Sequence, residues 1–461
     1  MSTHDPFDQL LTTWLHDGAG AGAPDYLNET LSAIEGRHQR PSWTFPTRWL
    51  PVNPDVHRVA PARSILLLAA LALLLAAGLV ALAVVGSRPR VPTQLPPPFG
   101  LARPGLIAFD RDGRIVLANP DGSGVHPLRP SEAKQFGATF SRDGTRVAFW
   151  QEDGFKLVHG ASTQKAADLW VVDVDGSHAV NLTPDLELAP SSGVPAGGWS
   201  PDGASIAFVA DKDVGMYVAP TDGSAPPRAI GDAGLLPMFP SWSPDGSRIA
   251  FAGVERLADD RLGPPKVYVI NPDGTGQEQV SREGAGDGTG ALPQWSPDGR
   301  MLLYGVDVSA PKDPQDPPAE GPPAHVEIVT AERGSTGWTE RVVVQSSAIW
   351  VSTLSNDGSR IAFLRSRPDI FEGDLFVVGV DGTGEKMVSD RLVNVSSPCW
   401  SPDDRTIAML TGPIPPGGEA AGFGWPNQAY TLFPVDGGTP SEIPAGRVDG
   451  VFACSWQRLA P

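Results

Sequence analysis

A few short motifs in this sequence have residue types that could bind a metal ion. Two Asp-x-Asp-Gly segments, at residues 110–113 and 173–176, resemble the start of a calcium-binding loop. An EF-hand loop also needs a glutamate about six residues after the glycine, and neither segment has one. Because Asp-Gly is also a common hairpin turn, we interpret both segments as turns.

The sequence offers little for nucleophilic or metal-assisted catalysis. An α/β-hydrolase needs Gly-x-Ser-x-Gly on a strand-to-helix turn, and this pentapeptide does not occur. The nearest sequence is Gly-Trp-Ser-Pro-Asp at residues 198–202. The eight histidines are scattered, with none at the spacing of metal ligands. We therefore predict no enzyme activity, and no catalytic residue, metal site or cofactor.

The overall composition indicates which scaffold these motifs belong to. Glycine and proline contribute 52 and 48 of the 461 residues, which is typical of a chain with many turns and few long helices. Hydrophobic residues make up 41% and include 13 tryptophans, so the chain has enough apolar material for a core. The net charge of −18 argues against a nucleic-acid partner, because such binding depends on Lys and Arg.

One phrase, close to Trp-Ser-Pro-Asp-Gly-x-x-Ile-Ala-Phe, recurs six times after residue 105. Its serine lies at positions 141, 200, 243, 296, 355 and 401, at intervals of 43 to 59 residues. Repeats of about 40 to 50 residues that are lengthened by insertions are typical of a β-propeller. Ser-Pro-Asp-Gly fits a type I turn between two strands, and Ile-Ala-Phe fits a strand with alternating large and small side chains.

Most copies are followed by a second hairpin with an Asp-Gly or Gly-Gly turn, so each copy supplies the four strands of one blade. Residues 106–128 provide three strands without a preceding Trp-Ser strand, and residues 452–460 provide that missing strand. We therefore predict an all-β fold, a seven-bladed β-propeller of four-stranded blades over residues 105–461. Pairing of the C-terminal strand 452–460 with the first three strands would close the ring and remove its exposed edge.

The repeats resemble those of the TolB-type propeller family, whose WD-repeat-like units carry the Trp-Ser-Pro-Asp-Gly phrase followed by an Asp-Gly hairpin. The resemblance covers residues 105–461. It implies an extracytoplasmic propeller that acts as a protein-interaction platform, similar in fold to the propeller domains of prolyl oligopeptidases. The N-terminal domain of classical TolB proteins is absent here, so the resemblance does not identify the partner.

The residues before the repeats divide into three segments. Residues 65–85 are an uninterrupted apolar run whose helix would be about 30 Å long, so we predict a single transmembrane helix at residues 63–86. A short helical region at residues 1–62 precedes it, and a Pro-rich spacer at residues 87–104 follows. Arginines flank the span equally, and the TolB resemblance decides the topology: a cytoplasmic N-terminus, which could dock a cytoplasmic partner, and a propeller outside the bacterial cell membrane.

Long segments between the second and third strands of several blades are expected to gather on one face of the ring. They are residues 151–167, 252–265, 307–325 and 411–428. Variable loops on a rigid scaffold commonly carry binding sites, so we predict that a protein or small ligand binds there. The candidate binding residues are Lys156, His159, Arg256, Asp259, Asp260, Arg261, Lys312, Arg365 and Trp425.

Two functions of different classes are compatible with these features. The first is a membrane-anchored binding or sensing platform without catalysis. The alternative is a hydrolase or lyase that acts on cell-wall or saccharide material in the central channel. Acidic residues around the axis would favour the enzyme, and small or apolar residues there would favour the binding platform.

The chain has two cysteines, Cys399 and Cys454, in the innermost strands expected for the last two blades. Their positions relative to the neighbouring tryptophan differ by one residue, so their side chains should point in opposite directions. We therefore predict two buried thiols. A disulfide that fastens the ring is the alternative.

Overall fold

The computed structural model describes most of the repeat region and none of the N-terminal segments. The described residues are 99–158, 162–184, 198–209, 215–232, 234–256, 262–282, 292–308, 325–335, 337–346, 349–366, 372–393, 396–412, 428–446 and 455–460. The predicted helical region, membrane span and most of the spacer lie outside them. Within this part of the chain, no helix has the length and apolar character needed to cross a bilayer.

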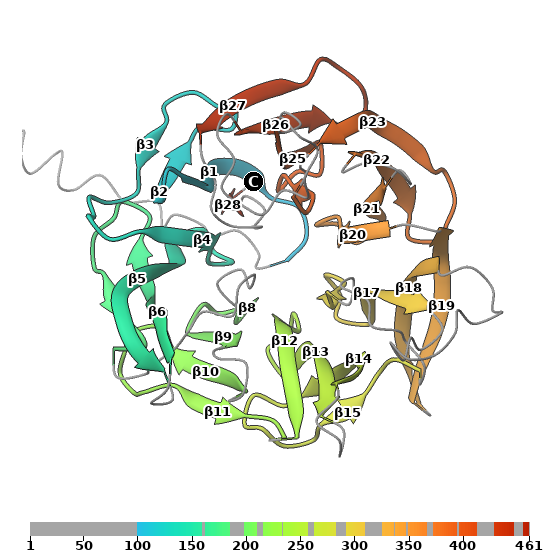
Figure 1. The fold of residues 1–461 in the computed structure, drawn as a ribbon. Coiled ribbons are helices and arrows are strands. Elements are labelled where there is room, and N and C mark those ends of the chain that lie inside the picture. Colours follow the sequence, from blue (N-terminus) through green and yellow to red (C-terminus); the bar gives the residue numbers. More distant parts are fainter. Residues whose placement is uncertain are drawn as a thin grey trace, which may run out of the picture. The chain divides into compact units, whose positions relative to one another are not determined.

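The described strands form seven antiparallel sheets of four strands each, arranged as blades around a central axis (Figure 1). From the innermost strand outward, blade 1 contains β4 (Gln135–Phe140), β5 (Arg146–Val158), β6 (Ser162–Asp173) and β7 (Val180–Asn181). Blade 2 contains β8 (Gly198–Trp199), β9 (Ser205–Val209), β10 (Met216–Pro220) and β11 (Arg228–Ile230). Blade 3 contains β12 (Leu235–Trp242), β13 (Ile249–Arg256), β14 (Leu262–Ile270) and β15 (Glu278–Gln279).

The remaining blades follow in the same order. Blade 4 contains β16 (Gln294–Trp295), β17 (Met301–Val308), β18 (His325–Gly334) and β19 (Gly337–Ser346). Blade 5 contains β20 (Ile349–Leu354), β21 (Arg360–Ser366), β22 (Glu372–Gly379) and β23 (Lys386–Val393). Blade 6 contains β24 (Cys399–Trp400), β25 (Thr406–Thr411), β26 (Gln428–Pro434) and β27 (Ser441–Gly446). The predicted seven-bladed, all-β propeller is confirmed.

Blade 7 combines strands from the two ends of the repeat region. Its order is β28 (Ser455–Leu459), β1 (Arg103–Arg111), β2 (Arg114–Ala118) and β3 (His126–Pro127). β28 pairs antiparallel with β1, with Leu459 opposite Arg103 and Trp456 opposite Ile107. The predicted closure is therefore confirmed.

The Ser-x-Asp-Gly turns between the first two strands of blades 1 to 6 share one hydrogen-bonded geometry. In each, the serine hydroxyl donates to the aspartate two residues later at 2.6–2.7 Å. The serine carbonyl accepts the backbone N–H of the fourth residue at 2.9–3.0 Å. That residue has a φ of 57° to 75°, and it is glycine in five copies and Asp404 in the sixth. The turn predicted from the sequence is confirmed.

The small residue of the Ile-Ala-Phe strand makes room for the tryptophan of the next blade. Ala207 of blade 2 lies in one buried cluster with Trp242 of blade 3, and Ala250 lies with Trp295 in the next. Where blade 5 has Leu354 at the tryptophan position, blade 4 has Leu303 at the alanine position, and both lie in the same cluster. The alternation therefore keeps the volume between blades nearly constant, as close packing requires.

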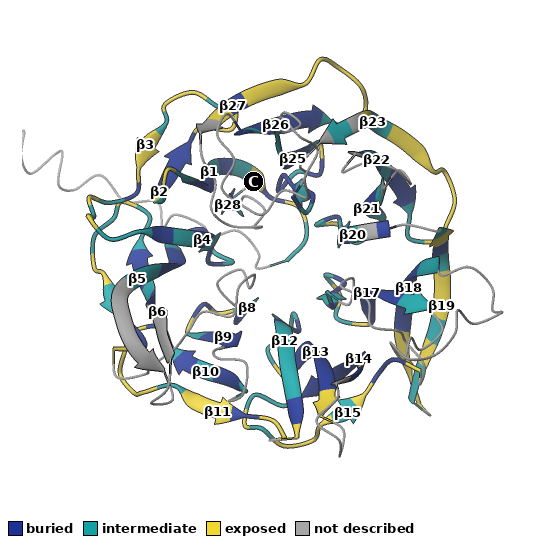
Figure 2. Cartoon of the chain, viewed as in Figure 1, coloured by how far each residue is buried: buried dark blue, intermediate teal, exposed yellow. Residues whose placement is uncertain are grey.

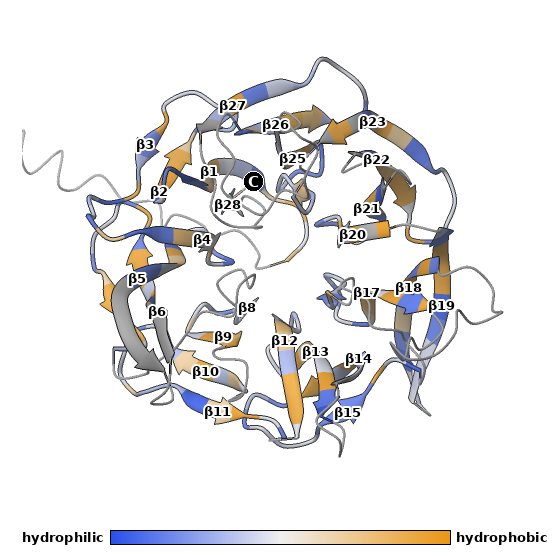
Figure 3. Ribbon diagram, in the orientation of Figure 1, coloured by the Kyte–Doolittle hydropathy of each residue, from blue (hydrophilic) through white to orange (hydrophobic). Residues whose placement is uncertain are grey.

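The core follows the middle strands of each blade, whereas much of the outer strands faces solvent. Figure 2 shows β3, β11 and β27 as largely exposed, and the second strands as largely buried. Figure 3 shows hydrophobic residues on second strands such as β9 and also on β12 and β10. The second strand of a blade buries side chains toward both neighbouring blades, as β9 does, and this gives a rigid ring on which loops and turns are held.

The long segment predicted at residues 151–167 extends the sheet. β5 and β6 stay paired up to Val158 opposite Ser162, well beyond the pair of Glu152 and Ala167. The sequence between them has no regular apolar alternation, so its pairing could not be read from the pattern.

Candidate functional site

The two faces of the ring are built from different connections. The six Ser-x-Asp-Gly turns, which join the first and second strands of blades 1 to 6, lie on one face, here called the turn face. The second strands end, and the first and third strands of these blades begin, at the opposite face, here called the loop face. This arrangement follows from the antiparallel order of each sheet.

Three of the nine predicted binding residues lie among the described residues. Lys156 is in the extended hairpin of blade 1, opposite Gln164, and Arg256 is exposed at the end of β13. Arg365 is near the end of β21. The structure places these three in blades 1, 3 and 5, so it does not bring them together. The others lie outside the described residues, and they are His159, Asp259, Asp260, Arg261, Lys312 and Trp425.

Arg365 has a structural role in blade 5. Its two terminal nitrogens contact the two carboxylate oxygens of Glu385 at 3.1 Å each. Its guanidinium carbon lies 4.4 Å from the centroid of the Phe376 ring, a cation–π contact. The Arg365 guanidinium is thus paired with an acid and an aromatic ring of its own blade. Arg365 is therefore a weaker ligand-binding candidate than the sequence indicated.

A cavity of about 170 Å³ lies on the loop face between blades 2 and 3. We call it the inter-blade cavity, and its lining includes Met216, Ile230, Asp232, Leu235, Pro237 and Phe251. Gly215 and Gly231 also line it, and a Cβ atom added at either would meet nothing within 4 Å. None of the nine predicted residues is in this lining, because the cavity arises where two blades meet and not within one loop.

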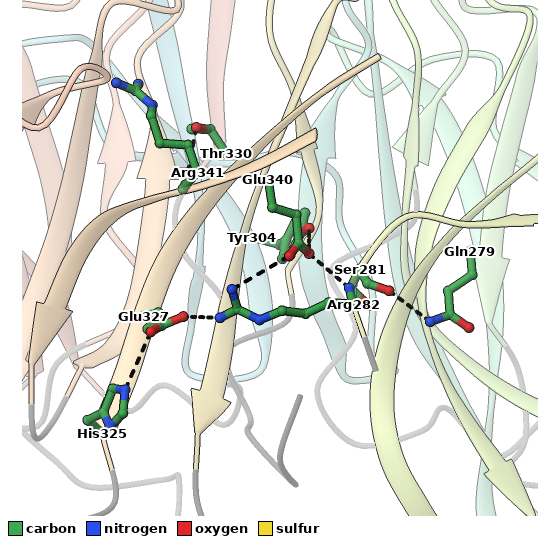
Figure 4. A network of polar contacts seen from close by, with 9 residues as sticks. All are labelled: Gln279, Ser281, Arg282, Tyr304, His325, Glu327, Thr330, Glu340 and Arg341. Atoms are coloured by element: carbon green, nitrogen blue, oxygen red, sulfur yellow. Dashed lines mark hydrogen bonds and ion pairs between the residues drawn. The ribbon is translucent and has the colours of Figure 1, made fainter. Parts of the chain in front are cut away.

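A polar network joins blades 3 and 4 toward the loop face (Figure 4). Arg282, which follows β15, bonds to Glu327 through its guanidinium, and its other terminal nitrogen lies 3.7 Å from Glu340. The backbone N–H of Arg282 also donates to Glu340 at 3.0 Å. Tyr304 donates to the same Glu340 oxygen at 2.5 Å, and His325 lies 3.4 Å from Glu327.

One arginine of this network lies between two largely buried carboxylates. The side chains of Glu327 and Glu340 are only 10% and 13% exposed. Burial and the hydrogen bond to Glu340 raise the pKa of Tyr304 well above its usual value, so this phenol stays protonated and donates. The network therefore joins two blades through one guanidinium that is shared between two carboxylates. Sequence reasoning missed it because Arg282 and Glu340 belong to different repeats.

A second cavity, of about 120 Å³, lies toward the turn face and is lined by residues of blades 1, 3, 4, 5 and 7. We call it the axial cavity, and its lining includes Phe99, Arg142, Gln294, Trp295, Asn356 and Arg458. It therefore brings two arginines together, although the chain as a whole carries a net charge of −18. The lining matches neither expectation for the axis, since it is neither acidic nor mainly small and apolar.

The two arginines are held differently. Arg458 is 6% exposed and donates to Asn356 Oδ1 at 2.9 Å and to the Gly100 carbonyl at 2.5 Å. The Arg142 guanidinium lies 4.5 Å from the centroid of the Phe99 ring, and among the described residues it has no hydrogen-bond or ion-pair partner. Burial and the charge of Arg458 lower the pKa of Arg142 to about 10. Arg142 thus stays charged at neutral pH, with no counter-ion among the residues that the structure describes.

Three departures from the repeat phrase meet at this end of the axis. Arg142 and Asn356 stand at the position that is proline in four of the six copies, and Asp404 stands where the other copies have glycine. The Asp404 carboxylate accepts the Asn356 side-chain amide and backbone N–H, each at 2.8 Å. The sequence indicates these three residues, because each departs from the repeat phrase. Only the closed ring shows that they lie close together.

Metal-ligating side chains and cysteines can be located only in part. Within the part of the chain that the structure describes, no group of three or more His, Cys, Asp or Glu side chains could hold a metal ion. Cys399 is partly exposed at the start of β24, opposite Ala408. Cys454 lies outside the described residues, so the pairing of the two cysteines stays a prediction.

Several solved structures are similar to this chain at low sequence identity. TolB from Acinetobacter baumannii is 15% identical with a TM-score of 0.44, over 79% of this chain and 68% of that one. A prolyl endopeptidase is 12% identical with a TM-score of 0.47, over 77% and 51%. An oligogalacturonate lyase, solved with manganese, is 14% identical with a TM-score of 0.36, over 73% and 98%.

The comparisons identify neither a family nor a function. No family model matches the chain, and no curated protein matches it. The similar solved structures include TolB and enzymes of two kinds. The class that the structure itself defines is a seven-bladed β-propeller of four-stranded blades.

Proposed function

We propose that the protein is a binding platform without catalysis. In this proposal the predicted span at residues 63–86 anchors it in the cell membrane, residues 1–62 are cytoplasmic and the propeller lies outside. The observation that carries the binding role is the inter-blade cavity on the loop face. This cavity has an apolar lining with one aspartate, Asp232, at a junction between two rigid blades.

The size of the cavity favours a protein partner over a free small molecule. Sites for small organic ligands are usually about 300 to 1,000 Å³, whereas this cavity has about 170 Å³. It therefore suits one apolar side chain of a partner that also contacts the surrounding loops. Anchoring of an aromatic or aliphatic side chain in such a desolvated cavity is a common basis of tight protein recognition.

Filling the cavity tests the proposal. Ala229 is exposed on β11 and lines the cavity, so Ala229→Trp should block it with little effect on the core. Ala204 is exposed on the turn face, and Ala204→Trp is the matched control. Tagged full-length chains are crosslinked in membranes, and captured proteins are quantified by mass spectrometry. A partner lost with A229W and kept with A204W supports the proposal, whereas equal capture by both variants contradicts it.

The location is tested separately from the binding role. Protease added to intact cells should digest the propeller and spare residues 1–62 if the proposed topology is right. Digestion only after the cells are opened would overturn the topology without touching the binding proposal.

A further inference from the structure

We propose that a second copy of this chain pairs with the open edge of β19, so that two propellers join through one continuous sheet. β19 is the outermost strand of blade 4 and lies at the rim of the ring, where several of its residues are exposed (Figure 2). The inter-blade cavity lies elsewhere, between blades 2 and 3. The pairing therefore goes beyond the binding role proposed for the loop face.

The outer edge of blade 4 is longer and more regular than those of the other blades. β19 has ten residues, whereas β3, β7, β11 and β15 have two or three. β23 has eight and β27 has six, but the pairing of β23 shifts register twice and β27 contains Pro444. The β19 ladder runs without a shift from Gly337 to Val342. Long regular edges pair readily with other strands, which is why most proteins shorten or interrupt them.

The backbone groups of β19 alternate between the sheet and the rim. Arg333 donates its N–H to the carbonyl of Arg300, so odd-numbered residues of β18 bond to β17 and even-numbered ones to β19. Those even-numbered residues lie opposite residues 337, 339 and 341 of β19. The N–H and C=O groups of Trp338, Glu340 and Val342 therefore point away from β18. Among the described residues, these groups have no backbone partner.

The three outward-facing residues are self-complementary about a twofold axis at Glu340. When a second copy runs antiparallel, Trp338 lies opposite Val342 of the second copy, and Val342 lies opposite its Trp338. Every outward-facing residue then meets another one, so the strands exchange hydrogen bonds at all three positions. Aromatic and β-branched side chains pair favourably across strands, and Val342 is 39% exposed.

The backbone pattern also excludes the neighbouring register. An axis at Val342 would place Glu340 opposite Val344 of the second copy. Val344 lies opposite Ile328, an even-numbered residue of β18, so its N–H and C=O groups already point into the sheet. That register loses the bonds at Glu340, and the axis at Glu340 is therefore the favoured one.

The favoured axis brings two copies of Glu340 opposite each other. Like charges in this position normally destabilise a strand pair. Here each carboxylate is turned into its own propeller, where it accepts the Arg282 N–H and the Tyr304 hydroxyl (Figure 4). Its side chain is 13% exposed, and the Arg282 guanidinium lies 3.7 Å away. The carboxylate thus keeps its own partners, while the backbone of Glu340 stays available at the edge.

β19 is held in position on both of its faces before a second strand arrives. Arg341 donates to the Val380 carbonyl of blade 5 at 2.5 Å. The Trp338 ring lies 6.1 Å from the Trp295 ring, between centroids. A strand that is already fixed loses little conformational freedom when another strand is added, and this favours association.

The test measures the mass of the full-length chain in detergent by sedimentation velocity, and wild type should be a dimer at micromolar concentration. Val342→Pro removes an N–H that points to the rim, and proline is tolerated at such edge positions, so blade 4 keeps its own pairing. We expect this variant to raise the dimer dissociation constant at least tenfold. Val342→Thr, the matched control, keeps the N–H and the β-branched shape and should change the constant less than threefold.

Two further measurements complete the test. Val342→Lys covers the case in which V342P does not fold, since it keeps the backbone donor but places a charge opposite Trp338 of the second copy. A disulfide reports the register in a chain without its two native cysteines. Co-expressed T339C and R341C chains should crosslink with a mild oxidant, because these positions face each other across the axis, whereas T339C alone should not.

The outcomes separate the possible occupants of the edge. A monomeric wild type overturns the proposal, and so does a dimer that V342P and V342K leave unchanged, because that dimer must use another surface. A dimer without the T339C–R341C crosslink overturns the assigned pairing. A different protein that co-purifies in equal amount and is lost with V342P would show that the edge takes a foreign strand, and the second copy would then be wrong.

Discussion

The carboxylate of Asp404 accepts the backbone N–H of Asn356 across the junction of blades 5 and 6, at 2.8 Å. It also accepts the Asn356 side-chain amide and the backbone N–H of Asp357, each at 2.8 Å. Asp404 stands where the other turns have glycine, and its φ of 57° lies in the left-handed region. Asp404 therefore adopts a backbone conformation that glycine adopts more easily, and its carboxylate forms three hydrogen bonds between blades.

Restoring glycine at this position should destabilise the ring. Asp404→Gly relieves a φ that aspartate tolerates at modest cost, but it leaves the donors of Asn356 and Asp357 without their acceptor. We expect the free energy of unfolding to fall by about 2 kcal/mol, since hydrogen bonds to charged groups contribute about 1.5–3 kcal/mol. Urea unfolding measures the change. Asp404→Asn keeps one acceptor oxygen and should lose less, and a glycine variant more stable than wild type would contradict the prediction.

Acid should weaken the propeller through its Ser-x-Asp-Gly turns. The hydrogen bond from the Ser243 hydroxyl, followed by the Ser247 N–H, lowers the pKa of Asp245, and Asp298 is lowered mainly by the Ser296 hydroxyl. A folded pKa below the unfolded one means that the unfolded chain takes up protons first as the pH falls. The stabilisation is thus complete above a pH of about 4 and is lost progressively below it.

Calorimetry between pH 7 and pH 2.5 measures this loss as a falling Tm. Asp245→Asn removes one titrating turn, so its Tm should depend less steeply on pH than that of wild type. Burial raises the pKa of Asp404, which therefore contributes with the opposite sign, because its stabilisation is present at low pH and lost as the pH rises through its folded pKa. The opposite contribution of this one group is smaller than the summed contribution of the repeated turns. A Tm that rises on acidification would show that the turns do not control acid stability.

Removing Arg282 should destabilise the junction of blades 3 and 4. Arg282→Ala leaves Glu327 and Glu340 largely buried without their shared cation. Breaking a buried ion pair costs about 3–5 kcal/mol, and the Arg282 side chain is 44% exposed, so we expect about 2 kcal/mol after solvent screening. Guanidinium unfolding measures it. Arg333→Ala, which removes an exposed partner of Glu278 at 3.4 Å, is the matched control and should cost less than about 0.5 kcal/mol.

Trp456 should be the most sensitive position of the closing strand. It is 7% exposed and lies in one buried cluster with Ile107, Ala408 and Tyr430. Trp456→Ala removes this packing at the junction of blades 6 and 7, where about 3–5 kcal/mol is expected. Chemical unfolding followed by fluorescence measures it, and Leu101→Ala, at a side chain that is 50% exposed, serves as the control. Equal stability of the two variants would mean that β28 contributes little to closure.

The parts of the fold that repeat could be predicted from the sequence, because each repeat carries its own local signals. The Ser-x-Asp-Gly turn requires particular residues at fixed positions, and the alternation of Ala207 and its equivalents reflects the tryptophan of the next blade. The closing strand could be found by completing the four-strand count. The outer hairpin of blade 4 could not be predicted from this pattern, because it turns between Gly334 and Gly337 without an Asp-Gly sequence.

The sites could not be predicted in the same way, because their residues come from distant repeats. Arg458 meets Asn356 across 102 residues of sequence, and Arg282 meets Glu327 across 45. The loop residues chosen from the sequence were selected for exposure and charge, whereas the described cavities arise at junctions between blades. Arg365 is an example: it was selected for its charge, but its guanidinium is paired with Glu385 within its own blade.

The pairing of β28 with β1 also sets the order of events during synthesis. Leu106 and Gln457, which are joined by a hydrogen bond, lie 351 residues apart. At about 5–20 residues per second, the ribosome needs roughly 20 to 70 s to make the partner that β1 requires. Throughout that interval the edge of β1 that will pair with β28 is open. Until translation reaches Trp456, this edge must be covered by another molecule or kept away from other strands to avoid incorrect pairing.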